Sequence, residues 1–395
     1  MNKIMKDILI SSSSEPDGGS GISTYTKEIS ISLKKKGYAI HYLSPTPKDK
    51  TWLIENGITH ISSDRNVAQA ETCKRTFNYI KDNSIDAIIN NDNPIVTSLA
   101  PALRCPVISI GHMEKRTIAS LIAYNVEWMD YIVAISNDMK QTYTTRFNIP
   151  ISKCPVIHNG LNKAAEHVSQ SNSPKLKVIF AGEYSRIKGA DLIIDMIRTV
   201  HPVWSNFELN WYGNLPSNIV KKVASNPNIK IHGRVPRNIL MDSLKESDIF
   251  LMASRIEGCP MSMLEAMSYG VVPVTSNGKG AMKWLIDHGI HGYVCDLKNW
   301  PSQALDCINA LHTNRTLLDD MKISVLNHFK KNHLSDYTTD KLLQILSNPT
   351  VDRSNPKTKI TILHWHRTRT QKPTFLEKVY WRLGTLRTET TINLL

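Results

Sequence analysis

Residues 248–276, DIFLMASRIEGCPMSMLEAMSYGVVPVTS, contain the pattern that decides the fold. Two short apolar runs, DIFLMAS (248–254) and VVPVTS (271–276), each predict a buried strand. Between them, MSMLEAMSY (261–269) predicts a helix, because Pro260 suits the first turn of a helix and a glycine follows the last residue. A strand, a helix and a second strand in this order predict a parallel sheet covered by helices.

Two acidic residues, Glu257 and Glu265, frame the start of this predicted helix. The first N–H groups of the helix, on Met261, Ser262 and Met263, would face an anion such as a diphosphate. A carboxylate accepts two hydrogen bonds, so the two acids suit the vicinal hydroxyls of a sugar or a ribose. The segment therefore predicts a nucleotide-sugar site. The alternative is that Glu265 only stabilises the helix through the helix dipole.

Strands alternate with helices along most of the chain, which predicts an α/β protein. A polar, Ser/Asn-rich stretch interrupts the alternation near the midpoint, and this favours two domains over one large doubly wound sheet. We therefore expect, in chain order, a Rossmann-like domain (1–160), a linker (161–176), a second Rossmann-like domain (177–335), a further helix (336–349) and a basic aromatic tail (350–395).

The composition limits the classes of binding partner that the sequence favours. Among 395 residues, 48 Lys and Arg exceed 35 Asp and Glu, which gives a formal net charge of +13. Such a surplus favours an anionic partner, namely nucleic acid, anionic lipid or a phosphorylated small molecule; the alternative is a generally basic surface. Nucleic acid is the weakest of these, because the sequence has no RRM, zinc-finger or helix-turn-helix signature.

The location of the protein is predicted from the cysteines and the hydropathy. None of the six cysteines forms a C-x-x-C pair, which argues against zinc ribbons and redox pairs and suits reduced thiols. The sequence contains no apolar run of roughly 18 residues, so no transmembrane helix is predicted. We expect a cytoplasmic protein that can be peripheral on the inner face of the cytoplasmic membrane. Its predicted tail, 350–395, interleaves basic residues with Trp365, Phe375, Tyr380 and Trp381, which suits an anionic membrane surface. The alternative is a solvated tail.

A second candidate site is GGSG, residues 18–21, which lies between a predicted strand and a predicted helix. Glycines let the backbone approach a ligand, and the helix start favours an anion. Because Ser23 and Thr24 follow Gly21, the stretch is not G-x-G-x-x-G, and a dinucleotide fingerprint is not supported. A plain tight turn is the alternative.

Taken together, these segments resemble retaining, family-4-type glycosyltransferases (glycosyl transferases group 1) of the GT-B fold. The similarity covers roughly residues 5–345 and includes the E-x7-E motif of the family at Glu257 and Glu265. Three further groups of residues carry it: the donor-domain segments VIFAGEYSRIKGADLII and GIHGYVCD, the glycine loop GGSGISTYTKEIS, and the interdomain stretches YIVAISNDMKQTY and PVIHNGLN. The resemblance implies two Rossmann-like domains facing a cleft, with the acceptor side in 1–160 and the donor side in 177–335. The helix 336–349 would cross back to the N-terminal domain.

The resemblance also implies roles for individual donor-site residues. Glu257 would contact hydroxyls of the transferred sugar, and Glu265 the ribose. Lys188 would be a cation on the phosphates of the leaving group, while the backbone of Met261 and Ser262 would hold the diphosphate. The neighbouring loop residues Gly258, Cys259 and Pro260 would line the same site.

Five further positions gain a role from the resemblance. Arg234 and Val235 would meet the base through their backbone, and Gly19 and Gly21 would approach the phosphate or the acceptor. His112, after the apolar run PVISIG, matches a histidine near the reacting sugar, so the implied catalytic set is His112, Glu257 and Lys188. The alternative for His112 is a loop histidine without a catalytic role.

One departure from the family pattern concerns the phosphate contacts. The family has an arginine directly after the glycine of its G-R…KG segment, whereas this chain has Glu183. Arg186, two residues before Lys188, can replace it as a charge-assisted contact. Otherwise reduced activity or an altered donor is expected. Cys259 and Pro260 also replace the usual aromatic and glycine residues, which would reshape the donor pocket.

The function implied is the retaining, metal-independent transfer of a sugar, with a UDP-sugar favoured as the donor. The acceptor would be a hydroxyl of a glycan or lipid-linked saccharide in bacterial lipopolysaccharide or polysaccharide biosynthesis. No cofactor beyond the nucleotide-sugar substrate is expected, and nucleic acid is not expected as a partner. Two alternatives stay open: a sugar-nucleotide epimerase of the same fold, and a non-catalytic binding protein.

Overall fold

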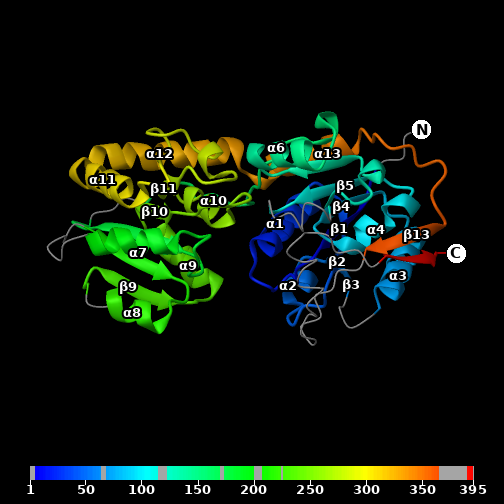
Figure 1. Ribbon diagram of the computed structural model, residues 1–395, viewed down its shortest axis with the longest axis horizontal. Coiled ribbons are helices and arrows are strands. Elements are labelled where there is room, and N and C mark those ends of the chain that lie inside the picture. The colour runs from blue at the N-terminus through cyan, green and yellow to red at the C-terminus, as the bar shows by residue number, and fades with distance from the viewer. Residues whose placement is uncertain are drawn as a thin grey trace. The chain divides into compact units, whose positions relative to one another are not determined.

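A computed structural model describes residues 5–63, 68–113, 122–169, 173–199, 207–223, 226–363 and 389–394. The chain divides into two compact units. Unit 1 comprises Met1–Asn159 and Ser335–Leu395, and unit 2 comprises Gly160–Leu334. Figure 1 labels the elements of both units along the chain.

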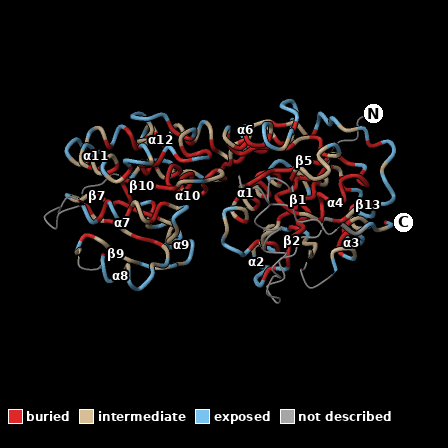
Figure 2. Tube along the Cα trace, in the orientation of Figure 1, coloured by how far each residue is buried: buried red, intermediate tan, exposed pale blue. Residues whose placement is uncertain are grey.

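Unit 1 is built on a six-stranded parallel sheet with the order β3-β2-β1-β4-β5-β6. Its central strands are buried along their whole length, which explains their continuous apolar runs (Figure 2). The strands are β1 (Asp7–Ser12), β2 (Ala39–Ser44), β3 (Thr59–Ser62), β4 (Ala87–Asn91), β5 (Val107–Gly111) and β6 (Tyr131–Ala134). Because β1 lies between β2 and β4, successive connections leave it in opposite directions, and this makes the gap between β1 and β4 the topological switch point.

The helices of unit 1 cover this sheet. They are α1 (Gly21–Lys35), α2 (Thr51–Glu55), α3 (Gln69–Asp82), α4 (Pro94–Leu99), α6 (Asn137–Arg146) and α13 (Ser335–Leu346), with short 3₁₀ turns at Ala100–Ala102, Val126–Trp128 and Ile151–Lys153. The Ser20 hydroxyl caps the start of α1 by accepting from the Ser23 N–H, and Tyr25, Ile29 and Leu33 are buried one turn apart.

Unit 2 repeats the topology of unit 1. Its six parallel strands have the order β12-β11-β10-β7-β8-β9, so β7 and β10 correspond to β1 and β4. The strands are β7 (Leu176–Ala181), β8 (Phe207–Tyr212), β9 (Ile229–Gly233), β10 (Ile249–Met252), β11 (Val272–Ser276) and β12 (Tyr293–Cys295). The helices are α7 (Ala190–Thr199), α8 (Ser217–Val223), α9 (Arg237–Lys245), α10 (Met261–Met267), α11 (Trp300–Thr313) and α12 (Arg315–Asn332), with a 3₁₀ turn at Met282–Trp284.

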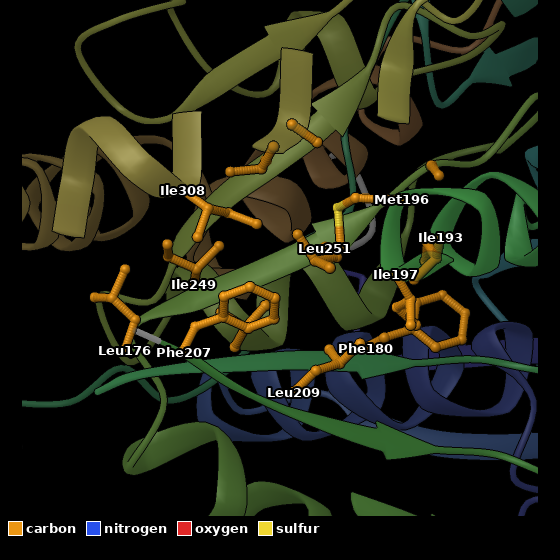
Figure 3. Close-up of a cluster of buried hydrophobic side chains, with 14 of the residues drawn as sticks. Leu176, Phe180, Ile193, Met196, Ile197, Phe207, Leu209, Ile249, Leu251 and Ile308 are labelled. Carbon is orange, nitrogen blue, oxygen red and sulfur yellow. The ribbon is translucent and has the colours of Figure 1, made fainter. Parts of the chain in front are cut away.

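The core of unit 2 lies between the sheet and the helices α7 and α11. Figure 3 shows Leu209 and Phe180 on the strands facing Ile193 and Ile197 of α7, and Ile249 facing Ile308 of α11. Each of these side chains is almost fully withdrawn from water, and burying a side chain of this size stabilises the fold by about 1.5–3 kcal/mol. This core fixes the strand ends from which the candidate site projects.

The helix α13 returns to unit 1, as the sequence predicts. The Ser32 hydroxyl on α1 donates to Asp336 Oδ1 at 2.6 Å and lies 2.7 Å from the Thr339 hydroxyl. Lys36 Nζ and Asp340 Oδ1 form an ion pair at 2.8 Å at the end of α1. The C-terminal helix is therefore part of the N-terminal unit.

The segment expected to be a linker, 161–176, is packed onto unit 2. The Ala165 N–H donates to the Ser268 carbonyl at 2.8 Å, and Lys322 Nζ donates to the Ser169 carbonyl at 2.7 Å. The Ser/Asn-rich composition of the segment is typical of an interdomain linker. These hydrogen bonds nevertheless satisfy backbone groups of the segment. The segment is therefore a folded part of unit 2 where it is described.

The predicted tail, 350–395, differs from the structure in its first part. Arg353 is buried, and its guanidinium donates to Asp130 Oδ2 at 2.9 Å and to the Trp128 carbonyl at 2.6 Å. The strand β13 (Lys359–Leu363) then pairs antiparallel with β14 (Glu389–Asn393). Asp130 also accepts from the Thr350 N–H, so an internal carboxylate fixes this segment, and no local sequence pattern shows that. Trp365, Phe375, Tyr380 and Trp381 lie outside the described residues.

In the described part of the chain, none of the helices combines the length and the apolar character that crossing a membrane requires.

Candidate functional site

The switch point of unit 2 brings together two residues that the sequence predicts. Lys188 follows β7, Glu257 follows β10, and Lys188 Nζ donates to both carboxylate oxygens of Glu257, at 2.8 and 3.0 Å. The hydroxyl of Ser254 donates to the Oε1 atom of Glu257 at 2.7 Å. The Glu257 side chain is only 9% exposed, whereas Lys188 remains 39% exposed. The carboxylate is therefore held rigidly, and the lysine can reach a further anion.

Two glycines make this arrangement possible. Gly189 has φ +67°, and a Cβ atom there would overlap the Ala253 carbonyl. Gly280 has φ +109°, and a Cβ atom there would overlap the Glu257 carbonyl. Only glycine combines a left-handed backbone with such close approach. The loop after β7 and the loop after β11 thus pack directly against the backbone that carries Glu257.

Glu265 forms a separate ion pair that sequence reasoning missed. Arg237 Nη2 lies 2.6 Å from Glu265 Oε1, where the glutamate side chain is 7% exposed and the arginine 52%. Arg237 is the first residue of α9, and Glu265 is the fifth residue of α10, so the pair joins the start of α9 to the second turn of α10. The available signal was Pro236 before Arg237, which marks a helix start beside the predicted base-binding stretch.

The helix that carries Glu265 begins as expected and ends early. α10 spans Met261–Met267 rather than 261–269, because Ser268 already has C-cap geometry and Gly270 is left-handed. Pro260 occupies the N-cap position and supplies no side-chain hydrogen bond to the first turn. Cys259, Pro260 and Met261 are buried, whereas Gly258 and Ser262 are partly exposed.

The loop between β7 and α7 is braced by Arg255, another residue that sequence reasoning missed. Its guanidinium donates to both carboxylate oxygens of Asp191, at 2.7 and 2.9 Å, and to the Arg186 carbonyl at 2.6 Å. The side chains of Arg186 and Glu183 are exposed. The backbone of Arg186 is therefore structural here, while its side chain extends into solvent. Two further predicted contacts, Arg234 and Val235, connect β9 to α9, with Arg234 exposed and Val235 partly buried.

The unit 1 residues predicted from the sequence lie near its own switch point. Gly19 is exposed with φ +62°, and Gly21 is the first residue of α1. One turn further along α1, the Tyr25 ring lies edge-on to the His112 ring, with centroids 4.9 Å apart. The structure thus brings His112, at the end of β5, against the helix that the glycine loop begins.

His112 is a buried, uncharged group. Its Nε2 atom lies 3.0 Å from Asn91 Oδ1, an arrangement in which the histidine nitrogen donates. Burial lowers the pKa of His112 to about 3, so the imidazole is neutral at pH 7. His112 can therefore donate a hydrogen bond, and at pH 7 it supplies no positive charge.

Asp92 is the group that sequence reasoning missed in unit 1. It directly follows β4, is 7% exposed, and has a left-handed φ of +53°. Among the described residues, none makes a hydrogen bond of ordinary geometry to either of its carboxylate oxygens, although the backbone amide of His112 acts on the carboxyl. Burial raises the pKa of this carboxyl to about 8, an effect partly offset by the backbone amide of His112. The signal in the sequence was a polar run, NNDN (90–93), directly after an apolar strand.

Where the structure describes the chain, no group of three or more His, Cys, Asp or Glu side chains is placed to hold a metal ion.

Comparison with known proteins identifies both halves of the chain. Residues 175–314 match the family model described as glycosyl transferases group 1, and residues 19–164 match that of glycosyltransferase family 4. Among curated relatives, the lipopolysaccharide 1,6-galactosyltransferase of Salmonella typhimurium is 23% identical, with 69% of this chain and 78% of that protein covered. The matched stretches span only 43% and 30% of the lengths of two other curated relatives.

Solved structures share the fold. A glycosyltransferase of Rickettsia africae matches with a TM-score of 0.72 at 16% identity, covering 88% of this chain and 99% of that one. HepE of Anabaena, solved in complex with UDP, matches with a TM-score of 0.67 at 15% identity, covering 87% of this chain and all of that one. The expected architecture, two Rossmann-like units of the GT-B type, is confirmed.

Proposed function

Since the chain belongs to the family-4 glycosyltransferases (glycosyl transferases group 1), we propose that it transfers a sugar from a nucleoside diphosphate, favouring UDP, to a hydroxyl group. The acceptor in this proposal is a glycan or a lipid-linked saccharide. The observation that carries it is the state of the two motif glutamates. Glu257 and Glu265 are both withdrawn from water, and each is held by a cation.

The proposed role of Glu257 follows from its two hydrogen-bond donors. Lys188 and Ser254 fix the carboxylate and together use both lone pairs of Oε1, but Oε2 accepts only from Lys188, and a carboxylate accepts about four hydrogen bonds. The remaining lone pair of Oε2 would accept a hydroxyl group of the transferred sugar. Because the carboxylate is already rigid, little side-chain entropy is lost when the sugar binds.

Lys188 is proposed as the cation of the leaving group. As the glycosidic bond breaks, negative charge grows on the β-phosphate, and a fixed cation stabilises that state more than it stabilises the bound donor. Lys188 has three N–H donors and directs them only partly to Glu257. Its exposed fraction leaves room for a phosphate, and Arg186 extends from the same loop.

The retention of configuration at the anomeric carbon is part of the proposal. In such a transfer the bond from the anomeric carbon to the phosphate oxygen breaks, and a bond to the acceptor oxygen forms on the same face. The acceptor proton passes to the departing phosphate, which keeps atoms and charge balanced. Neutral His112 already donates its one side-chain N–H to Asn91 Oδ1, so toward the reacting sugar it would offer only its other ring nitrogen as an acceptor.

The choice of donor and acceptor class is supported by the relatives. HepE of Anabaena is solved with UDP, with UDP-glucose, and with UDP and glucose together. The Salmonella relative is named for lipopolysaccharide, and others are named for O-antigen and capsular polysaccharide biosynthesis. A UDP-sugar donor and an acceptor from bacterial surface-polysaccharide assembly are therefore proposed, with peripheral attachment to the cytoplasmic face of the membrane.

The proposal is tested by thermal-shift measurements with UDP, GDP, ADP and CMP. A ligand that binds only the native state raises the melting temperature. We expect UDP to stabilise the wild type and Glu265→Ala to remove the effect, because the ribose contact is lost. Glu246→Ala is the matched control, since Glu246 forms an exposed ion pair with Lys177. If no nucleotide stabilises the wild type, the proposal fails and a non-catalytic binding protein becomes the better account.

A further inference from the structure

The end of β4 in unit 1 holds polar groups that the proposed donor chemistry does not use. Both carboxylate oxygens of Asp92 and the Nδ2 atom of Asn91 are buried, and no described residue makes a hydrogen bond of ordinary geometry to any of the three, although the His112 backbone amide acts on the Asp92 carboxyl. Leaving a buried polar group unpaired costs about 1–3 kcal/mol, so folded proteins contain few of them. Three unpaired atoms on consecutive residues therefore require an explanation.

The preceding residue shows that packing at this strand end can satisfy an amide fully. Asn90 Oδ1 accepts from the Ser11 hydroxyl at 2.6 Å, and Asn90 Nδ2 donates to the hydroxyls of Ser109 at 2.9 Å and Thr97 at 3.2 Å. All of these groups lie inside unit 1. At this strand end, the unpaired atoms therefore belong to the last residue of β4 and the residue after it.

The backbone at Asp92 has an unusual conformation and is held by its neighbours. Its left-handed φ of +53° is uncommon for a residue other than glycine. The loop is also fixed on both sides, because the Ser13 N–H donates to the Asn91 carbonyl at 3.2 Å and Asn93 Nδ2 donates to the Ser12 carbonyl at 3.1 Å. Residues in such conformations cluster at functional sites.

The location and the chemistry indicate what this cluster would bind. It lies at the β1–β4 switch point, where α/β sheets of this kind bind ligands. His112 Nε2 is bonded to the same Asn91 amide through its oxygen, which leaves the amide nitrogen as the available donor. A carboxyl without a cation beside it disfavours a phosphate, and the described residues form no metal site. One donor beside one carboxyl suits an alcohol, which accepts and donates at once.

We propose that Asn91 and Asp92 form a binding site for a sugar hydroxyl at the β1–β4 switch point of unit 1. This inference rests on the proposed function, because the reaction brings two sugars to the protein, the transferred sugar of the donor and the acceptor sugar. The Asn91 amide donates to the hydroxyl oxygen, and the hydroxyl hydrogen is donated to Asp92. His112 positions the Asn91 amide by bonding to its oxygen.

The two sources of the hydroxyl are distinguished with Asp92→Leu, which removes the hydrogen-bonding oxygens, and Asp92→Asn, which retains one. If the donor sugar is bound, Asp92→Leu raises the Kd of UDP-glucose or UDP-galactose about five- to tenfold and leaves the Kd of UDP unchanged. If the acceptor is bound, all three Kd values are unchanged, and the KM for octyl glycosides of glucose, galactose or N-acetylglucosamine rises by the same factor. Asp92→Asn should stay within about threefold of the wild type in either case. Asp242→Leu, at an exposed residue of unit 2, is the matched control.

A measurement on the wild type keeps the proposal testable if Asp92→Leu does not fold or if no donor binds. Glucose, galactose and N-acetylglucosamine are added to protein labelled with ¹³C at the aspartate side-chain carboxyls. The resonance that disappears in Asp92→Asn should move with at least one sugar and stay unchanged with UDP. If no sugar moves it and no sugar-dependent constant changes in a folded Asp92→Leu variant, the site is overturned. Failure of UDP to bind the wild type would overturn the proposed function separately, since the monosaccharide result does not depend on it.

Discussion

The two units carry an acidic residue after the same strand of the same topology, Asp92 after β4 and Glu257 after β10. In unit 2 a lysine and a serine hold the carboxylate of Glu257. In unit 1 no described group pairs with the carboxyl of Asp92. The fold therefore fixes where an acid lies, while the surrounding loops decide which groups hold its carboxyl. A paired carboxylate suits a site that handles phosphates and their counter-charges, and an unpaired neutral one suits hydroxyl groups.

The largest expected effect concerns the charge of Asp92. Its pKa of about 8 in the folded protein exceeds the ordinary value of 3.8, so the folded state holds a proton that the unfolded state has lost. The resulting stability is present below pH 4 and is lost as pH rises to 8. Asp92→Asn removes this dependence, so the stability of the variant relative to the wild type should rise by about 6 kcal/mol at most across that range.

Urea unfolding at several pH values measures this difference directly. His112 also titrates, and because its pKa is lowered in the folded state, its contribution to the free energy of unfolding falls as pH drops below 6.5. This contribution is present in both the wild type and Asp92→Asn, so subtracting one stability curve from the other removes it to first order. Parallel stability curves for Asp92→Asn and the wild type would show that Asp92 is ionised in the folded protein, and the contrast between the two acids would disappear.

A second prediction concerns the ion pair between Lys188 and Glu257 in unit 2. Lys188→Ala removes the proposed cation of the leaving group and should lower kcat by about 10²–10³-fold, the range for one lost transition-state donor. Steady-state kinetics of sugar transfer measures this. Lys177→Ala is the control, because Lys177 also forms an ion pair with a glutamate, Glu246, but away from the switch point. Equal rates for the two variants would remove Lys188 from the reaction.

A third prediction tests whether loop packing positions Glu257. Gly280→Ala would place a Cβ atom on the Glu257 carbonyl, whereas Gly289→Ala, at φ +79°, meets nothing within 4 Å. Both substitutions strain a left-handed backbone, so the difference between them isolates the overlap. We expect Gly280→Ala to be less stable than Gly289→Ala by about 1–3 kcal/mol, measured by urea unfolding. Similar losses of stability in both variants would mean that the loop after β11 moves to accommodate the added Cβ atom and does not position Glu257.

The smallest expected effect belongs to the second ion pair. Arg237 is half exposed, so Arg237→Ala leaves Glu265 buried beside a gap that water can enter. We expect a loss in stability of about 1 kcal/mol and a several-fold weaker binding of UDP, measured by calorimetric titration. An unchanged Kd for UDP would show that the pair is only structural.

Much of the fold could be predicted from the sequence, because continuous apolar runs and helical spacing report burial locally. The strands, the division near residue 160 and the start of α10 at Met261 follow from such patterns, whereas the return of the C-terminal helix was implied by the family resemblance. The fixed segment after Thr350 could not be predicted. It depends on Asp130, a buried carboxylate more than two hundred residues earlier in the chain.

The residues of the candidate site also fall into two groups, those that could be predicted from the sequence and those that could not. Lys188 and Glu257 stand out in the sequence because they belong to recognisable segments, and the structure places them together. Arg237, Arg255 and Asp92 were missed, because pairing and burial depend on which strand ends become neighbours. An exposed arginine and a buried, protonated aspartate look the same as any other charged residue in a one-dimensional pattern.

The most direct test of the contrast between the units is calorimetric titration of UDP into the wild type, Lys188→Ala and Asp92→Leu. We expect UDP to bind the wild type, to bind Lys188→Ala at least several-fold more weakly, and to bind Asp92→Leu with wild-type affinity. If Asp92→Leu is folded and weakens UDP as much as Lys188→Ala does, the unit 1 acid serves the nucleotide, and the division of roles between the two switch points is wrong.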